Sequence, residues 1–329
     1  MMHLYSVRNG GLEKLELPKP GQQAADALWI DLSTPSQEEE AATEKLLGVN
    51  IPTQEEMREI EESSRIYEDR GALIMTGVIV AGISEKRPTR SEVSFVLAPA
   101  HLVTIRYADP LPFKTFAQKC SRKPDDHNSS DLLFVSLIEE IVERVADVLE
   151  KVTGELDSIA GEVFSEEGAA AGDQNRAPRV DLQVIVRRLW RASALLGKLR
   201  ESLLTFNRIL AFFRKSEESW LKDEAKSKAE SQQRDIASLT EYAQHLTEKI
   251  GHLQDATFNL INIEQNRVIK VFSIAAVLFL PPTLVATVYG MNFKYMPELN
   301  WLLGYPLAIG LMILSAFLPF YWFKRNGWL

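Results

Sequence analysis

A line of mostly polar and small residues recurs every three or four positions in the C-terminal quarter of this sequence. It runs through Asn259, Asn262, Asn266, Ile269, Ser273, Ala276, Leu280, Thr283 and Thr287. The spacing is that of a coiled-coil seam, but these side chains would hold helices together poorly in water. Inside a bilayer, polar side chains are costly unless they face a partner or water. The pattern favours a helix whose polar side lines a water-filled path shared with copies of itself; the alternative is a small-residue packing seam.

Two apolar stretches, residues 268–291 and 301–323, decide the class of protein. The first contains one charged residue, Lys270 near its start, and the second contains none. A transmembrane helix needs about 20 predominantly apolar residues. We therefore expect a membrane protein with two transmembrane helices, the first carrying the polar line, rather than a soluble protein with two buried core helices.

Basic residues flank the two stretches on the sides away from the short segment between them. Arg267 and Lys270 stand at the start of the first stretch, and Lys324 and Arg325 follow the second. The segment between them, 292–300, is nine residues long. By the positive-inside rule, both long ends are expected in the cytoplasm and the segment 292–300 outside. We see no signal-peptide pattern at the N-terminus.

The charge is unevenly divided along the chain. Residues 266–329 hold five basic residues and one acidic residue, and subtracting them from the totals of 37 and 45 leaves 32 and 44 in residues 1–265, a net charge of −12. An acidic region of this kind does not suit nucleic acid but attracts divalent cations. The single cysteine, Cys120, fits a reducing cytoplasm and excludes an internal disulfide.

The N-terminal region, residues 1–130, is predicted to be an α/β domain. Capping-box spacing marks two helix starts, Ser36 with Glu39 and Thr53 with Glu56. Runs rich in apolar and β-branched residues predict four strands at Leu28–Leu32, Ala72–Ile83, Glu92–Leu97 and Leu102–Tyr107.

Helical periodicity dominates the rest of the chain. Helices are expected over Asp131–Phe164, then, after a breaker at 167–174, over Asp181–Lys215, and finally from near Ser219 to Met291. The last would be about 110 Å long, bent or loosened at Pro281-Pro282. The fold class is α+β, with a long helical stalk that continues into the first of two transmembrane helices. The expected segments are a helical region (131–218), the stalk (219–267), a pore-lining helix (268–291), an external loop (292–300), a second transmembrane helix (301–323) and a basic tail (324–329).

Enzyme and nucleotide-binding motifs are absent from the sequence. It has no phosphate-binding glycine loop, nucleophile elbow or HExxH pair, and its five histidines are scattered. We expect neither an enzyme nor a bound cofactor, and no transport driven by nucleotide hydrolysis. A divalent cation that moves inward gains about 4.6 kcal/mol per 100 mV of membrane potential, so a passive pore is sufficient.

A short motif at the outer end of the first stretch points to a family. Gly290, Met291 and Asn292 are followed by the sequence MPEL at 296–299 and by the second apolar stretch. In this setting the chain resembles the CorA magnesium transporters, which share the GMN motif. The resemblance covers 258–329, including NIEQNR at 262–267 and the basic ending, and is weaker at 29–32 and 62–68.

The resemblance implies a homopentamer in the cell inner membrane, a multi-pass protein with both termini in the cytoplasm. The first transmembrane helix would line one pore, and Gly290, Met291 and Asn292 would form its selectivity filter, with Glu298 gathering cations at the mouth. A ring of neutral carboxamides can hold the water shell of Mg²⁺ without binding the ion too tightly; helix capping is an alternative, compatible role for Asn292. The pore-lining positions of the family fall on Asn266, Ile269, Phe272, Ala276, Leu280 and Thr283, and all but Phe272 lie on the polar line.

The family also implies regulation by Mg²⁺ bound between subunits, which holds the channel closed. Its site maps onto Glu59 and, on the stalk, near Ser231, which is not acidic; Asp235, one turn further, is the substitute we predict. Both carboxylates could instead belong to solvated helix faces.

The function expected is a Mg²⁺ influx channel in contact with membrane lipid, which also passes Co²⁺ and Ni²⁺. One alternative is a zinc or other divalent-metal transporter of the same superfamily, although the intact GMN motif argues against it. The other is a non-conducting, membrane-anchored coiled-coil scaffold, which would not need a polar line.

Overall fold

The computed structural model describes residues 1–8, 11–15, 26–83, 85, 87–120, 129–169, 181–292, 294, 296–297 and 301–326. The chain divides into two compact units, Met1–Gln254 and Asp255–Leu329. Helix α7, Asp223–Tyr289, belongs to both, and ends two residues before the expected Met291. The predicted α+β class, with an N-terminal α/β domain, a long helix and two candidate membrane helices, is confirmed.

Unit 1 is built on a mixed sheet of seven strands in the order β2-β1-β3-β7-β6-β5-β4. All four expected strands are present within one to three residues of their predicted ends, whereas β1, β2 and β4 were not predicted. The strands are β1 (Met2–Arg8), β2 (Gly11–Leu15), β3 (Trp29–Ser33), β4 (Ile66–Asp69), β5 (Ala72–Ala81), β6 (Thr89–Leu97) and β7 (Leu102–Arg106).

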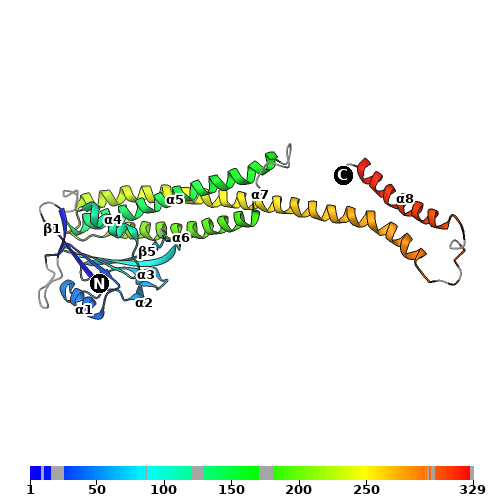
Figure 1. The fold of residues 1–329 in the computed structure, drawn as a ribbon. Coiled ribbons are helices and arrows are strands. Elements are labelled where there is room, and N and C mark those ends of the chain that lie inside the picture. Colours follow the sequence, from blue (N-terminus) through cyan, green and yellow to red (C-terminus); the bar gives the residue numbers. More distant parts are fainter. Residues whose placement is uncertain are drawn as a thin grey trace. The chain divides into compact units, whose positions relative to one another are not determined.

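One face of the sheet is covered by the short helices α1 (Gln37–Leu47), α2 (Gln54–Met57) and α3 (Glu62–Arg65) (Figure 1). Both predicted capping boxes form. The Ser36 hydroxyl accepts a hydrogen bond from the Glu39 amide, and the Thr53 hydroxyl accepts one from the Glu56 amide. In return, the Glu39 carboxylate accepts a hydrogen bond from the Ser36 amide, and the Glu56 carboxylate accepts one from the Thr53 amide. The core on this face includes Leu4, Ile30, Leu32, Met57, Ile74, Val96 and Ile105.

The other face carries α4 (Leu111–Cys120), α5 (Ser130–Ala169) and α6 (Leu182–Lys215), with the first part of α7 packed on α5 and α6 (Figure 1). Gly77 of β5 permits the close approach of α6, since a Cβ there would lie 3.0 Å from Ile209 Cδ1. The Thr205 hydroxyl also accepts a 3.0 Å hydrogen bond from the Val78 amide of β5. Helix α5 continues to Ala169, beyond the expected end at Phe164 and into the predicted breaker; the rest of that breaker lies outside the described residues.

An ion pair is buried where β3 and β7 run side by side. Asp31 accepts hydrogen bonds from Thr104 Oγ1 at 2.9 Å and from Arg106 Nη2 at 2.8 Å, and both charged side chains are almost fully buried. The Arg106 guanidinium lies over the Phe113 ring of α4. This network joins the sheet to α4. Because both charged side chains are buried, removing either one would destabilise the fold by leaving the other charge poorly compensated.

Unit 2 consists of the C-terminal part of α7 and helix α8, Gly304–Arg325. Both helices are long and apolar enough to cross a membrane. None of the apolar window of α7 and 11% of that of α8 is buried within the chain. Helix α7 continues through Pro281 and Pro282 without ending.

Candidate ion pathway

The predicted pore-lining residues lie on α7 in unit 2, and all eight are exposed in the single chain. They are Asn266, Ile269, Phe272, Ser273, Ala276, Leu280, Thr283 and Thr287. By contrast, the side chain of Ile274, which is not on the polar line, is 9% exposed. The polar line is therefore free to face other copies of α7, although many of its neighbours on the helix are exposed as well.

Two hydroxyls near the outer end of this line donate hydrogen bonds to backbone carbonyls of α7. Thr283 Oγ1 donates to the Phe279 carbonyl and Thr287 Oγ1 donates to the Thr283 carbonyl, each at 2.7 Å. A threonine that bonds back to the carbonyl four residues earlier keeps its oxygen lone pairs free while its proton is occupied. Both positions thus present acceptors, which suit the hydrogen-rich water shell of a cation.

The GMN segment follows directly on the last residue of α7. The Gly290 amide donates to the Ala286 carbonyl at 2.9 Å and the Met291 amide to the Val288 carbonyl at 3.3 Å, which closes the helix end. A Cβ at Gly290 would lie 3.1 Å from the Ala286 carbonyl oxygen, so a glycine fits here and larger residues are crowded. Asn292 is exposed just beyond this turn, and Glu298 lies outside the described residues.

The predicted regulatory residues, Glu59 and Asp235, are both exposed and lie in different layers of unit 1. Glu59 follows α2 on one face of the sheet, whereas Asp235 is on α7, beyond the other face. Asp235 lies near Glu139 of α5: burial, repulsion from Glu143 and, more weakly, repulsion from Asp235 raise the pKa of Glu139. Within one chain the pair is separated by the sheet, so a shared ion would require two subunits.

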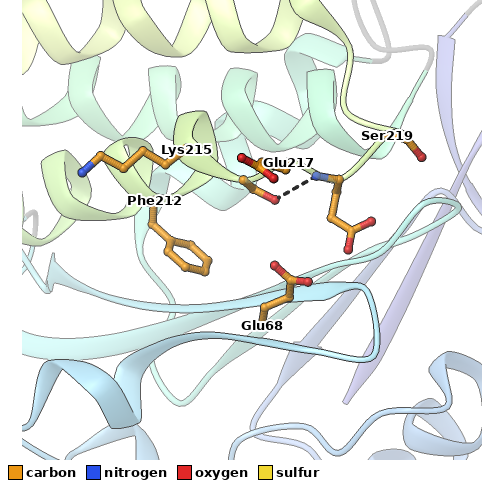
Figure 2. Close-up of a pocket in the computed structure, with 7 residues that line it drawn as sticks. Glu68, Phe212, Lys215, Glu217 and Ser219 are labelled. Carbon is orange, nitrogen blue, oxygen red and sulfur yellow. Dashed lines mark hydrogen bonds between the residues drawn. The ribbon is translucent and has the colours of Figure 1, made fainter.

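An acidic cavity that was not predicted from the sequence lies between β4 and the α6–α7 turn. It has a volume of about 570 Å³ and is lined by Glu68, Phe212, Lys215, Ser216, Glu217, Glu218 and Ser219 (Figure 2). A hydrogen bond shared with Glu218, followed by burial and the charge of Glu218, raises the pKa of Glu68. Sequence spacing could not reveal this cluster, because Glu68 and Glu218 are distant in the chain. Among the described residues, no group of three or more His, Cys, Asp or Glu side chains is arranged to hold a metal ion.

Comparison with known proteins identifies the family. The profile of the CorA-like Mg2+ transporter protein family matches residues 24–325. The magnesium transport proteins CorA of Escherichia coli K12 and of Salmonella typhimurium are each 33% identical to this chain over 331 residues, which covers all of both proteins.

Solved structures agree on the fold. The CorA magnesium transporter of Methanocaldococcus jannaschii matches 100% of this chain and 99% of its own with a TM-score of 0.75, at 19% identity. The full-length CmaX protein matches 98% of this chain and 96% of its own with a TM-score of 0.65, at 16% identity. With the family profile spanning nearly the whole sequence, this chain belongs to the CorA-like Mg2+ transporter family, a family of membrane transporters rather than enzymes.

Proposed function

We propose that this protein is a Mg²⁺ influx channel of the cell inner membrane, assembled as a homopentamer around its α7 helices. Both termini lie in the cytoplasm, and the 292–300 loop faces outward. Flux is passive, driven by the inside-negative potential. The observation that carries the proposal is the exposed, largely uncharged polar line of α7, which leads to Asn292 in a member of a Mg²⁺ transporter family.

The filter acts on the hydrated ion. Mg²⁺ loses its water reluctantly and prefers octahedral oxygen ligands. A ring of Asn292 carboxamides accepts hydrogen bonds from that water shell, and the acceptor oxygens of Thr287 and Thr283 continue the same surface inward. Because these groups are neutral, the ion binds weakly enough to leave. Further along, Leu280, Phe272 and Ile269 form an apolar constriction that gates by excluding water.

The test is uptake by purified protein in liposomes that contain a Mg²⁺-sensitive dye, with an inside-negative potential. Asn292→Ala is expected to reduce uptake to the level of empty liposomes while oligomer size is unchanged. Asn50→Ala, an exposed loop residue of unit 1, is the matched control and retains uptake. Normal uptake by a correctly assembled Asn292→Ala protein contradicts the proposed filter.

The same assay separates the competing functions. The channel is expected to pass Co²⁺ and Ni²⁺ as well, because both ions are divalent and accept oxygen ligands. Uptake of Zn²⁺ with exclusion of Mg²⁺ would instead assign the protein to zinc transport. An oligomer that conducts no cation would assign it to the scaffold class.

Gating by cytoplasmic Mg²⁺ is proposed to use Glu59 of one subunit and Asp235 of the next. Mg²⁺ that binds the closed state more tightly than the open state shifts the population toward the closed state. The double variant Glu59→Gln, Asp235→Asn should conduct at Mg²⁺ concentrations that close the wild type. The control is Glu38→Gln, Glu241→Gln, two exposed carboxylates on the same two layers. Closure of the first variant at the wild-type concentration excludes this pair as the sensor.

A further inference from the structure

Charge is sharply segregated between two neighbouring helices of unit 1. Helix α6 carries eight Lys or Arg residues and one acidic residue, Glu201. Helix α5 carries 11 Asp or Glu residues and two basic residues. Helix α6 is thus a concentration of positive charge in a region whose net charge is −12. The question is which carboxylates neutralise it.

Part of this charge is neutralised inside the subunit. Arg188 contacts Glu155 and Glu162 of α5 at 2.6 and 2.7 Å, and Arg214 contacts Glu230 of α7 at 3.1 Å. Three other arginines of α6, Arg187, Arg191 and Arg200, are exposed and form no ion pair with any residue that the structure describes. Their charges are not neutralised by any carboxylate of the bundle that the structure describes.

Two of these arginines, Arg187 and Arg191, share a face of α6 with an exposed tryptophan. Trp190 is 66% exposed, and Ala194 and Gly197 continue the face as a flat strip, with open space where a Gly197 Cβ would be. We define the α6 basic face as Arg187, Trp190, Arg191, Ala194 and Gly197. The C-terminal half of α6 packs on the sheet, while the N-terminal half extends past it with α5 (Figure 1). An exposed tryptophan among arginines is the composition of an interface hot spot.

Helix α5 offers the complementary surface. Asp147, Glu150, Gly154 and Gly161 are exposed and follow one another at intervals of three, four and seven residues, so they lie on one face. A Cβ at Gly154 or at Gly161 would meet open space. We define these four residues as the α5 acidic face. It matches the α6 basic face in two respects: opposite charge, and small residues beside the charges that allow a helix to approach closely.

We propose that the α6 basic face of each subunit packs on the α5 acidic face of the neighbouring subunit. The two faces differ, so the contact is head-to-tail, and a head-to-tail contact repeated around an axis closes a ring. The inference rests on the homo-oligomer of the proposed function and adds the side chains that hold its unit 1 parts together. Trp190 is the apolar anchor, and the arginine–carboxylate pairs set the register.

Paired cysteines test the contact in the full chain, purified in detergent in a Cys120→Ser background. The variant Ala194→Cys, Gly154→Cys is expected to form disulfide-linked ladders under mild oxidation, because each subunit supplies one thiol to each neighbour. Each single variant should stay monomeric on a denaturing gel, since a head-to-tail contact does not bring identical residues together. Dimers from a single variant, or no ladder from the double variant, contradict the contact.

Charge reversal tests the same contact without a cross-link. Arg187→Glu, Arg191→Glu should raise the dissociation constant of the oligomer by roughly tenfold or more at low salt, and less at high salt. Adding Asp147→Arg, Glu150→Arg should restore assembly, which a merely misfolded protein would not do. The control is Lys45→Glu, Arg58→Glu, an equal change of charge at exposed sites on the other face of the sheet.

The outcomes separate this inference from the proposed function. Unchanged assembly of the Arg187→Glu, Arg191→Glu variant contradicts the contact, whether or not the wild type takes up Mg²⁺. If instead these variants dissociate and the four-site variant recovers, the contact holds even for a protein that transports another ion. Binding of vesicles with anionic lipid that competes with assembly would assign the α6 basic face to the membrane and overturn the proposal.

Discussion

Unit 1 and unit 2 bury their apolar side chains to very different extents. Unit 1 has a continuous core on both faces of its sheet and along α5, α6 and the start of α7. In the described part of unit 2, the buried apolar side chains are Ile274, Ala308 and Phe323. Yet unit 2 is the more apolar of the two, with large side chains such as Phe272, Leu280 and Phe317 more than half exposed.

The difference shows where each unit obtains its stability. Unit 1 removes its apolar surface from water within one chain, so the hydrophobic effect acts inside the subunit. In the proposed function, unit 2 depends instead on lipid and on other copies of itself, and its backbone is satisfied within each helix as a bilayer requires. Changes that are severe in unit 1 should therefore be mild in unit 2 at positions that face lipid.

The reactivity of cysteines gives the largest contrast. Burial, with a smaller contribution from the charge of Glu140, raises the pKa of Cys120 to about 12. At pH 7 its thiolate fraction is then roughly a thousandfold below that of an ordinary exposed thiol. A cysteine introduced by Ala276→Cys on the polar line should react with water-soluble thiol reagents at least that much faster than Cys120, and block flux.

The controls for this experiment are Ile274→Cys and Val285→Cys, which face lipid or α8 in the proposed arrangement. Each is measured in a Cys120→Ser background by the rate of labelling and by the loss of Mg²⁺ uptake. Equal labelling at Ile274→Cys and Ala276→Cys would contradict the assignment of the polar line to the pore.

Two phenylalanines test the contrast in packing. Phe206 of α6 is 1% exposed and contacts the ring of Phe95, whereas Phe317 of α8 is 64% exposed. Phe206→Ala should lower the free energy of unfolding by about 3–5 kcal/mol, through lost burial and the cavity left behind. Phe317→Ala should cost less than about 1 kcal/mol, because its side chain is mostly exposed within the chain and detergent fills the space. Chemical unfolding in detergent, followed by circular dichroism, measures both, and similar losses would refute the contrast.

The buried ion pair of unit 1 should be the next most sensitive feature. Asp31→Asn removes the buried carboxylate that pairs with Arg106 and leaves it only the more exposed Asp109, at a cost of about 3 kcal/mol. The control is Asp157→Asn, which breaks the exposed pair with Lys249 and should cost about 0.5 kcal/mol or less. The same unfolding assay applies. If the two variants are equally stable, the Asp31–Arg106 pair is not a determinant of the fold.

The elements with a strong local signal were predictable from the sequence. Both capping boxes, the start of α6 at its Asp181 cap and the two apolar helices are set by nearby residues, and all are present. Strands β1, β2 and β4 were missed for a physical reason. They hold few buried apolar residues of their own. Strand β1 is fixed by pairing with β3, β2 by pairing with β1 and β4 by pairing with β5, contacts that a local pattern does not contain.

The candidate site was also predictable where its residues are close in the sequence, and not where they meet only in the fold. The polar line and the GMN residues are periodic or contiguous, so the sequence identified them, and their role in a pore stays a prediction. The acidic cavity and the two complementary faces of α5 and α6 depend on tertiary contacts. Glu68 meets Glu218 because β4 lies against the α6–α7 turn, which follows from the packing of α6 on the sheet.

The smallest expected effect concerns that cavity and depends on pH. The pKa of Glu68 is raised in the folded protein, chiefly by the hydrogen bond shared with Glu218. The folded state therefore binds this proton more tightly than the unfolded state does. The hydrogen bond between protonated Glu68 and Glu218 stabilises the protein at pH values below the pKa of Glu68 in the unfolded state. This stabilisation is lost as the pH rises through the pKa of Glu68 in the folded state.

Glu68→Gln should therefore raise the melting temperature of the protein slightly at pH 7 and leave it unchanged or lower near pH 4, because glutamine keeps the hydrogen bond without the charge. The effect is small, since Glu68 is exposed to solvent. Glu218→Gln should act in the same direction, and the double variant should gain less than the sum because the two residues share one interaction. Glu61→Gln, an exposed residue on the same side of unit 1 as α3, is the control. A gain at pH 7 that persists unchanged to pH 4 would mean that repulsion between Glu68 and Glu218 is not its cause.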